Sequence, residues 1–258
     1  MSDQTNLTNI KNEVSDKTKI TDAVLISVFF LFICWMLFFM DEFLGFGLKR
    51  HGLIPRTAEG LRGIFTMHFL HGDWKHITQN SLGFLVLNSF LFYFYRPIAW
   101  RVFFSILFIA PIFVWLFARG NNHIGASLLI YGEFAFLAVS GIVRYNPPLM
   151  RVALVVLTYY GSLVWYLFPI EARISFEGHI AGFGIGLVTA ILWRKLGPQK
   201  KVYQFETEPE LPDDENAYWK IPENRPAELP SNPPIPASEP TTITVKYHYK
   251  EKNDGELK

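Results

Sequence analysis

Long runs of apolar residues, separated by short polar or basic stretches, occupy most of the chain up to Trp193. A helix that crosses a bilayer needs about 20 mostly apolar residues, and the chain has six runs of roughly this length. We expect membrane-spanning helices over residues 23–40, 76–95, 98–117, 127–143, 149–168 and 178–193. The pattern therefore predicts an all-α, polytopic membrane protein built as a bundle of six transmembrane helices.

The segments around these runs divide the chain into three parts. Residues 1–21 form a polar N-terminal segment, residues 22–197 the six-span domain, and residues 198–258 a proline-rich, acidic tail. We expect the tail to be disordered and cytoplasmic because it has too few apolar residues for a core, and it could recruit a partner that the sequence does not name. The connection of residues 41–75 is too apolar for a free loop, so we expect a partly helical element in the membrane interface.

Lysine and arginine gather at three sites that fall on one face of the predicted topology. They are Arg96 with Arg101, Arg144 with Arg151, and the group Arg194, Lys195, Lys200 and Lys201. Basic residues concentrate in cytoplasmic loops, so we expect both termini inside, and three spans then begin at the outer face. A net charge of +1 gives no indication of nucleic acid binding, and the single cysteine, Cys34, excludes an internal disulfide.

Ser127, in the stretch Gly125-Ala126-Ser127, opens one of the three spans that begin outside. A serine at the start of a helix is commonly an N-cap that satisfies free backbone N–H groups. The same position suits a nucleophile, because the electropositive helix start and its free N–H groups stabilise a developing oxyanion. Gly125 gives the backbone room to approach a substrate.

His179 lies at the start of the last span, which also carries Gly178, Gly182, Gly184 and Gly186. Small residues allow helices to approach closely, as a serine–histidine hydrogen bond of about 3 Å requires. Tyr131, one turn after Ser127, would pack on the imidazole, and no carboxylate in the spans is a candidate third member. A packing residue and a haem or metal ligand are the alternative interpretations of this histidine.

His76 and Asn80 lie one turn apart on one face of the span that begins at residue 76. Both can donate hydrogen bonds to an oxyanion, and the alternative role is polar contact between helices. His68 and His71 precede them, and a metal site there is the weaker interpretation because the chain has no H-E-x-x-H pattern and no cysteine pair.

Three motifs in register resemble those of the rhomboid family of intramembrane serine proteases, in its six-span bacterial form. The motifs are His71-Gly72-Asp73-Trp74-Lys75-His76 with Asn80, Gly125-Ala126-Ser127 with Tyr131, and Gly178-His179 with Gly182 and Gly186. The resemblance covers residues 68–193 and implies a location in the bacterial plasma membrane.

The resemblance implies a catalytic dyad in which His179 deprotonates Ser127, with His76, Asn80 and the Ser127 backbone N–H binding the oxyanion. Single-span membrane proteins would be the substrates, cut near the outer membrane face at small residues in helix-destabilised segments. Neither a cofactor nor a metal is expected.

The chain departs from the family pattern at two places. Leu128 follows the serine where the family usually has glycine, and Leu61-Arg62-Gly63 stands where a Trp-Arg pair is common. A bulky residue at position 128 could narrow the substrate site or hold the two catalytic helices apart. The leucine motivates one rival interpretation, an inactive relative that binds membrane-protein clients. The second rival is a non-enzymatic histidine-containing membrane protein, such as a haem carrier or transporter.

Overall fold

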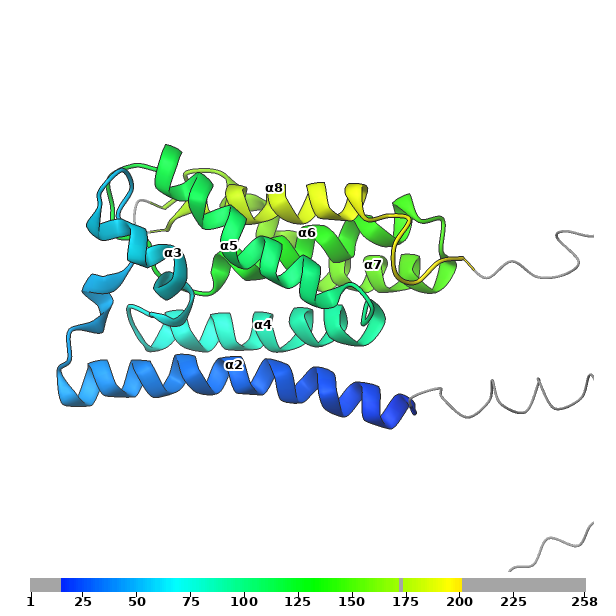
Figure 1. Cartoon of the computed structure of the whole chain (residues 1–258), viewed down its shortest axis with the longest axis horizontal. Helices are drawn as coiled ribbons and strands as arrows, with labels where there is room; N and C mark the ends of the chain where they lie inside the picture. The colour runs from blue at the N-terminus through cyan, green and yellow to red at the C-terminus, as the bar shows by residue number, and fades with distance from the viewer. Residues whose placement is uncertain (1–14, 172–173, 201–258) are drawn as a thin grey trace, which may run out of the picture. The chain divides into compact units, whose positions relative to one another are not determined.

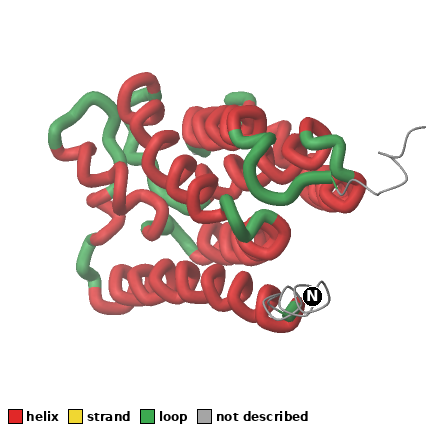
Figure 2. Tube along the Cα trace, turned by 45° about the vertical axis from the view of Figure 1, so that its right-hand side comes forward, coloured by secondary structure: helices red, strands yellow, loops and turns green. Residues whose placement is uncertain are grey.

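Helices form at each of the six segments that the apolar runs predict, and the computed structural model describes residues 15–171 and 174–200 (Figures 1 and 2). The helices are α2 (Asp16–Leu44), α4 (Trp74–Phe94), α5 (Ala99–Phe117), α6 (Ser127–Val143), α7 (Pro147–Tyr160) and α8 (Phe176–Leu192). The all-α membrane fold is therefore confirmed. The predicted tail, from residue 201 on, lies outside the described residues, as do residues 1–14.

Length and apolarity differ among these helices. Asp16–Leu44, Ala99–Phe117 and Pro147–Leu167 are long and apolar enough to cross a membrane, whereas α6 and α8 are apolar but shorter, with 17 residues each. α4 has 21 residues and a more polar composition. It carries His76 and Asn80 near its start.

The first helix extends beyond the predicted span at both ends. α2 begins at Asp16 because Ser15 caps it, accepting a hydrogen bond from the Thr18 N–H at 3.2 Å. It ends at Leu44, where Gly45 adopts a left-handed conformation with φ of 66°. Residues 16–21, which we expected in the polar N-terminal segment, thus form the first turns of this helix.

The fifth predicted span is not one continuous α-helix. α7 ends at Tyr160, and a 3-10 helix, η5 (Gly161–Leu167), continues the segment. Gly161 stands at the change of geometry, and glycine is a weak helix former because of its backbone freedom. The tighter 3-10 turns bring the backbone of Tyr166 to the start of α8, as described below.

The connection between α2 and α4 is structured, and it contains short helical turns as predicted. They are η2 (Leu48–His51), η3 (Glu59–Arg62), α3 (Gly63–Thr66) and η4 (Met67–Phe69). Leu53 forms an isolated antiparallel bridge with His123, and the Arg56 guanidinium donates to the Ala118 carbonyl at 2.7 Å. The connection thereby fixes the segment that leads from α5 into α6, at the end of the bundle where α4, α6 and α8 begin (Figure 1).

α6 is the central helix, since 13 of its 17 residues are buried. Its most extensive contact is with α8, along the face that carries Gly182 and Gly186. A Cβ placed on Gly182 would lie 2.1 Å from the Leu128 carbonyl oxygen, and one on Gly186 would lie 2.0 Å from that of Gly132. The backbones of the two helices therefore touch, which only glycine permits.

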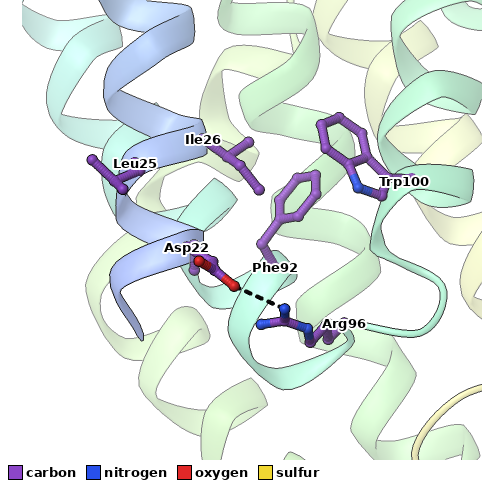
Figure 3. A pocket seen from close by; sticks show the side chains of 7 residues that line it. Asp22, Leu25, Ile26, Phe92, Arg96 and Trp100 are labelled. Carbon is purple, nitrogen blue, oxygen red and sulfur yellow. Dashed lines mark hydrogen bonds and ion pairs between the residues drawn. The ribbon is translucent and has the colours of Figure 1, made fainter. Parts of the chain in front are cut away.

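The opposite end of the bundle is held by two arginines. Arg144, at the end of α6, donates to the carbonyls of Trp193 at 2.7 Å and Arg194 at 2.9 Å and so satisfies the free end of α8. Arg96 pairs with Asp22 of α2 at 2.8 Å, beside a pocket also lined by Phe92 and Trp100 (Figure 3). Both contacts are remote from Ser127.

Two buried histidines of the α2–α4 connection make stability depend on pH. Burial lowers the pKa of His68 to about 4 and that of His71, where neighbouring His76 adds to the effect, to about 3. The unfolded chain therefore binds more protons below the ordinary histidine pKa of about 6.5. We expect full stability above this pH and a loss as the pH falls through 6.5 toward 4, about 3 kcal/mol for His68 alone.

The thermal midpoint of the purified protein, measured between pH 7.5 and 4.5, tests this expectation. His68→Asn keeps a donor for the Leu107 carbonyl, which His68 Nε2 contacts at 3.0 Å, and removes the titrating group. A wild-type midpoint that is flat over this range, or an unchanged slope in the variant, would contradict the assignment.

Candidate active site

Ser127 is the first residue of α6, and it does not cap the helix. The N-cap position belongs to Ala126, and the helix start has no side-chain cap. The Ser127 hydroxyl instead lies 3.1 Å from Nε2 of His179, at the start of α8. The structure thus favours the nucleophile over the capping interpretation of this serine.

The hydrogen bonds of His179 fix its tautomer. Its Nδ1 lies 2.9 Å from the backbone carbonyl oxygen of Tyr166 in η5, and a carbonyl only accepts. Nδ1 therefore carries the proton, which leaves the lone pair of Nε2 directed at the hydroxyl of Ser127. A histidine in this state can take the proton of that hydroxyl without any prior rearrangement.

Tyr131 holds the imidazole from the side. Its ring stacks on that of His179 with centroids 3.9 Å apart and planes 6° from parallel. The Tyr131 hydroxyl donates to the carbonyl of Leu163 at 3.0 Å, which fixes the tyrosine in turn. His179 is 6% exposed, so its ring is enclosed by these neighbours and does not rotate freely in water.

His76 and Asn80 converge on the backbone just before Ser127. A Cβ on Gly125 would lie 2.5 Å from His76 Nε2 and 3.2 Å from Asn80 Nδ2, and Gly125 adopts φ of 114°, which favours glycine. The Asn80 Nδ2 atom is buried and has no partner among the described residues. Two potential hydrogen-bond donors thus face the backbone two residues before Ser127.

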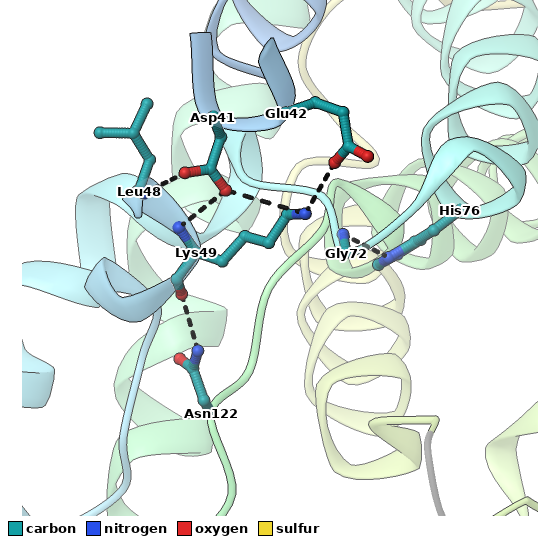
Figure 4. Close-up of polar contacts among 7 residues, drawn as sticks. All are labelled: Asp41, Glu42, Leu48, Lys49, Gly72, His76 and Asn122. Atoms are coloured by element: carbon teal, nitrogen blue, oxygen red, sulfur yellow. Dashed lines mark hydrogen bonds and ion pairs between the residues drawn. The ribbon is translucent and has the colours of Figure 1, made fainter. Parts of the chain in front are cut away.

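Local contacts orient His76. Asp73 caps α4 by accepting from the His76 N–H at 2.9 Å, and the Gly72 N–H lies 3.5 Å from His76 Nδ1 (Figure 4). An accepting Nδ1 leaves the proton on Nε2, the atom that faces Gly125. Nearby, Lys49 pairs with Asp41 and Glu42 (Figure 4). The Lys49 carbonyl accepts a hydrogen bond from the Asn122 side chain at 2.7 Å.

Leu128 does not hold α6 and α8 apart. Its side chain is 1% exposed and belongs to the core, and its carbonyl oxygen lies against Gly182 of α8. The contact between Ser127 and His179 forms with this leucine in place. The size of Leu128 suggested two effects, a narrower substrate site or separated helices. The prediction of separated helices is therefore wrong.

The remaining histidines do not assemble a metal site in the described part of the chain. No group of three or more histidine, cysteine or acidic side chains comes together there with geometry for an ion. The ring of His71 instead lies 5.1 Å from that of His76. His68 contacts the carbonyl of Leu107.

Sequence reasoning missed two features of the site. The Tyr166 carbonyl orients the ring of His179, and no side-chain motif could indicate a backbone group. Glu177 pairs with Arg119 at 2.9 Å, two residues before His179. The sequence signal for this pair was weak. It consisted of Glu177, two residues before the predicted catalytic histidine, and Arg119, in the connection between the third and fourth predicted spans.

The structure is a helical membrane bundle in whose interior a serine is hydrogen-bonded to a histidine. A family model described as "Rhomboid domain" matches residues 58–196, so the chain belongs to the rhomboid family. This family is one of intramembrane serine proteases and also has inactive members. The protein is accordingly an integral membrane protein.

Curated relatives come from mycobacteria. Uncharacterized protein Mb1372 of Mycobacterium bovis is 28% identical over 179 residues, 63% of this chain and 72% of the relative. Uncharacterized protein ML1171 of Mycobacterium leprae is 29% identical over 181 residues, 63% of this chain and 68% of the relative. Their names assign no activity that could be carried over.

Proposed function

We propose that this protein is an intramembrane serine endopeptidase with Ser127 as nucleophile and His179 as general base. The observation that carries the proposal is the 3.1 Å contact between the Ser127 hydroxyl and His179 Nε2, with the opposite ring nitrogen bound to a carbonyl. A nucleophile, a base and a group that orients the base are the minimum set for acyl transfer. Here the Tyr166 carbonyl and the Tyr131 ring replace a carboxylate.

In the proposed reaction, His179 takes the hydroxyl proton as Ser127 Oγ attacks the carbonyl carbon of a peptide bond. The oxyanion of the tetrahedral intermediate is bound by His76, Asn80 and the backbone N–H of Ser127. The intermediate collapses as the protonated His179 gives its proton to the leaving amine, which leaves an acyl-enzyme. Water, deprotonated by His179, then hydrolyses the ester and regenerates the serine.

The proposed substrates are single-span membrane proteins, cut near the outer membrane face within a segment that unwinds easily. The proposal includes six crossings of a bacterial plasma membrane with both termini in the cytoplasm. It is supported by the basic turns of the sequence and by the common end at which α4, α6 and α8 begin (Figure 1). A reporter fused within residues 121–123 should lie outside the membrane, and one fused after Lys201 inside.

A serine-directed fluorophosphonate probe on the purified, folded protein tests the proposed chemistry. The wild type should label at Ser127, identified by mass spectrometry, and should cleave a single-span substrate in detergent or liposomes. Thr158→Ala removes an exposed hydroxyl of α7, bonded only to the Leu154 carbonyl, and should change neither readout. A folded wild type without labelling or cleavage would refute the proposal.

The second candidate function is the binding of membrane-protein clients without cleavage, which the leucine at position 128 favours. Leu128→Gly separates the two. If the leucine only shapes the substrate site, the wild type is active and the variant accepts larger residues before the scissile bond. If the leucine blocks catalysis, the wild type shows no cleavage and the glycine variant gains activity.

Removal of either proposed oxyanion donor should lower the reaction rate by an intermediate amount. His76→Ala and Asn80→Ala should each lower kcat about 10²–10³-fold, because each removes one donor to the transition state. The matched control is Asn88→Ala, which removes a buried asparagine two turns further along α4 that bonds Ser27 at 2.8 Å. This control should lower the thermal midpoint with little change in kcat. Full activity in both oxyanion variants would assign the pair to helix packing.

A further inference from the structure

A set of contacts beside the catalytic dyad is not used by the proposed chemistry. It joins the segment between α5 and α6, which leads into Ser127, to the first turn of α8, which carries His179. We name it the loop–helix latch and define it by Arg119, His123, Ser175 and Glu177. The pair Arg119 and His123 is separated from the pair Ser175 and Glu177 by more than 50 positions in the sequence, so the two pairs meet only in the fold.

The first half of the latch is a hydrogen-bonded histidine. His123 Nε2 lies 3.1 Å from the Arg119 carbonyl, so this nitrogen carries the proton and Nδ1 accepts. Ser175 Oγ lies 2.6 Å from Nδ1 and donates to it, while its lone pair accepts from the Gly178 N–H at 3.2 Å. Ser175 is therefore both the N-cap of α8 and the point where that helix is tied to the loop.

The second half is an arginine that contacts the first turn of α8 and the residue that precedes its N-cap. The Arg119 side chain pairs with the Glu177 carboxylate at 2.9 Å, donates to the Ile174 carbonyl at 2.7 Å and lies over the Phe176 ring at 5.1 Å. The Glu177 side chain is 16% exposed and that of Arg119 37%, so water screens this pair partly, mainly on the side of the arginine. One guanidinium thereby contacts three groups within residues 174–177.

The loop side of the latch is itself anchored. His123 exchanges both backbone hydrogen bonds with Leu53, at 2.8 and 3.0 Å, and Asn122 donates to the Lys49 carbonyl at 2.7 Å. The latch therefore ties the start of α8 to a fixed support. Ser127 lies four residues beyond His123, and His179 lies four residues beyond Ser175, so the same short path sets the distance between them.

From this geometry we infer that Arg119, His123, Ser175 and Glu177 are positioning residues that hold His179 at hydrogen-bonding distance from Ser127. The inference rests on the proposed function, and it adds a second connection to the direct packing of α6 on α8. Displacement of a catalytic group by about 1 Å can cost about 10²-fold in rate. Loss of the latch should thus lower kcat much more than it changes KM.

The test uses Arg119→Ala, Glu177→Ala, His123→Ala and Ser175→Ala in the full chain. Each should lower kcat and the probe labelling rate of Ser127 about 10- to 10²-fold, with KM changed less than about two-fold because the substrate site is untouched. Arg119→Ala with Glu177→Ala should be no worse than the stronger single change, because the two act as one pair. Ser175→Thr keeps the hydroxyl and should restore the rate.

Matched controls exist at the far end of the bundle. Arg96→Ala and Asp22→Ala break an ion pair of similar length (Figure 3), and Ser15→Ala removes the N-cap of α2. These should lower the thermal midpoint by a similar amount and leave kcat unchanged. Equal losses of kcat in latch variants and controls would overturn the inference and show a general effect of stability.

Hydrogen–deuterium exchange gives a readout that does not need activity. Amides of residues 174–179 should exchange at least several-fold faster in the latch variants and at the wild-type rate in the controls. Unchanged exchange there would overturn the inference even if the protein is an active protease. A wild type that neither cleaves nor labels would refute the proposed function, and the exchange data would still decide whether the latch orders the start of α8.

Discussion

Ser127→Ala and His179→Ala should each reduce cleavage of a single-span substrate by on the order of 10⁶-fold, to the limit of detection. In the proposed reaction the serine supplies the bond-forming oxygen, and the histidine, whose Nε2 lies 3.1 Å from the serine hydroxyl, takes its proton. Neither can act without the other, so the double variant should be no slower than either single one. Probe labelling of residue 127 should disappear in the serine variant and fall by a similar factor in the histidine variant.

The dyad variants should remain folded, which separates chemistry from stability. Ser127 makes no helix cap, so its loss should shift the thermal midpoint only slightly. Ser27→Ala is the control for removal of a buried hydroxyl, because Ser27 bonds Ser89 and Asn88 on the far side of the bundle. That variant should lose stability and keep its cleavage rate. Additive effects of the two dyad changes would show that the residues do not act as a pair.

Much of the fold was predictable because membrane-spanning helices are recognisable in the sequence as long apolar runs. A bilayer leaves no water for backbone groups, so apolar runs of sufficient length must become helices, and α6 begins and ends where its run does. The ends of α2 were less predictable, since Ser15 and Gly45 cap the helix beyond the apolar run. The 3-10 geometry of Gly161–Leu167 was missed because an apolar pattern does not distinguish the two helix types.

The candidate site was predictable to the level of side chains with special chemistry. Ser127, His179, His76 and Asn80 could be chosen because polar groups are costly near a membrane, and topology placed three helix starts on one side. What could not be predicted were contacts made by backbone groups and loops. The carbonyl of Tyr166 and the pairing of Arg119 with Glu177 depend on the path of the chain between helices, which no periodicity encodes.

The glycines of α8 give the second large prediction, and they divide into two groups. Gly182 and Gly186 face the backbone of α6, where a Cβ would meet a carbonyl oxygen at 2.1 and 2.0 Å. Gly184, on the same helix, has nothing within 4 Å of its Cβ position. The sequence suggested all of them as small residues for close packing, and the structure assigns that role to only two.

Gly182→Ala should therefore lower activity strongly, while Gly184→Ala should not. A backbone oxygen cannot move aside, so the alanine at 182 must push α8 away from α6 at a cost of about 1–3 kcal/mol or more. The contact lies one residue from Ser127 and three from His179, so the 3.1 Å hydrogen bond opens with it. We expect a loss of about 10²-fold or more in kcat. The free energy of unfolding, measured in mixed micelles, should fall in the same variant.

The three glycine variants form a graded series that tests whether helix approach limits catalysis. Gly186→Ala should destabilise as much as Gly182→Ala, because its clash with the Gly132 carbonyl is as close, but it lies two turns from His179 and should cost less in rate. Gly184→Ala should be neutral or stabilising by up to about 1 kcal/mol, since alanine is the better helix former. If all three alanines behave alike, backbone contact between α6 and α8 does not set the geometry of the dyad. If only the alanine at 184 is tolerated, the distance between these two helices is what the glycines maintain for the reaction.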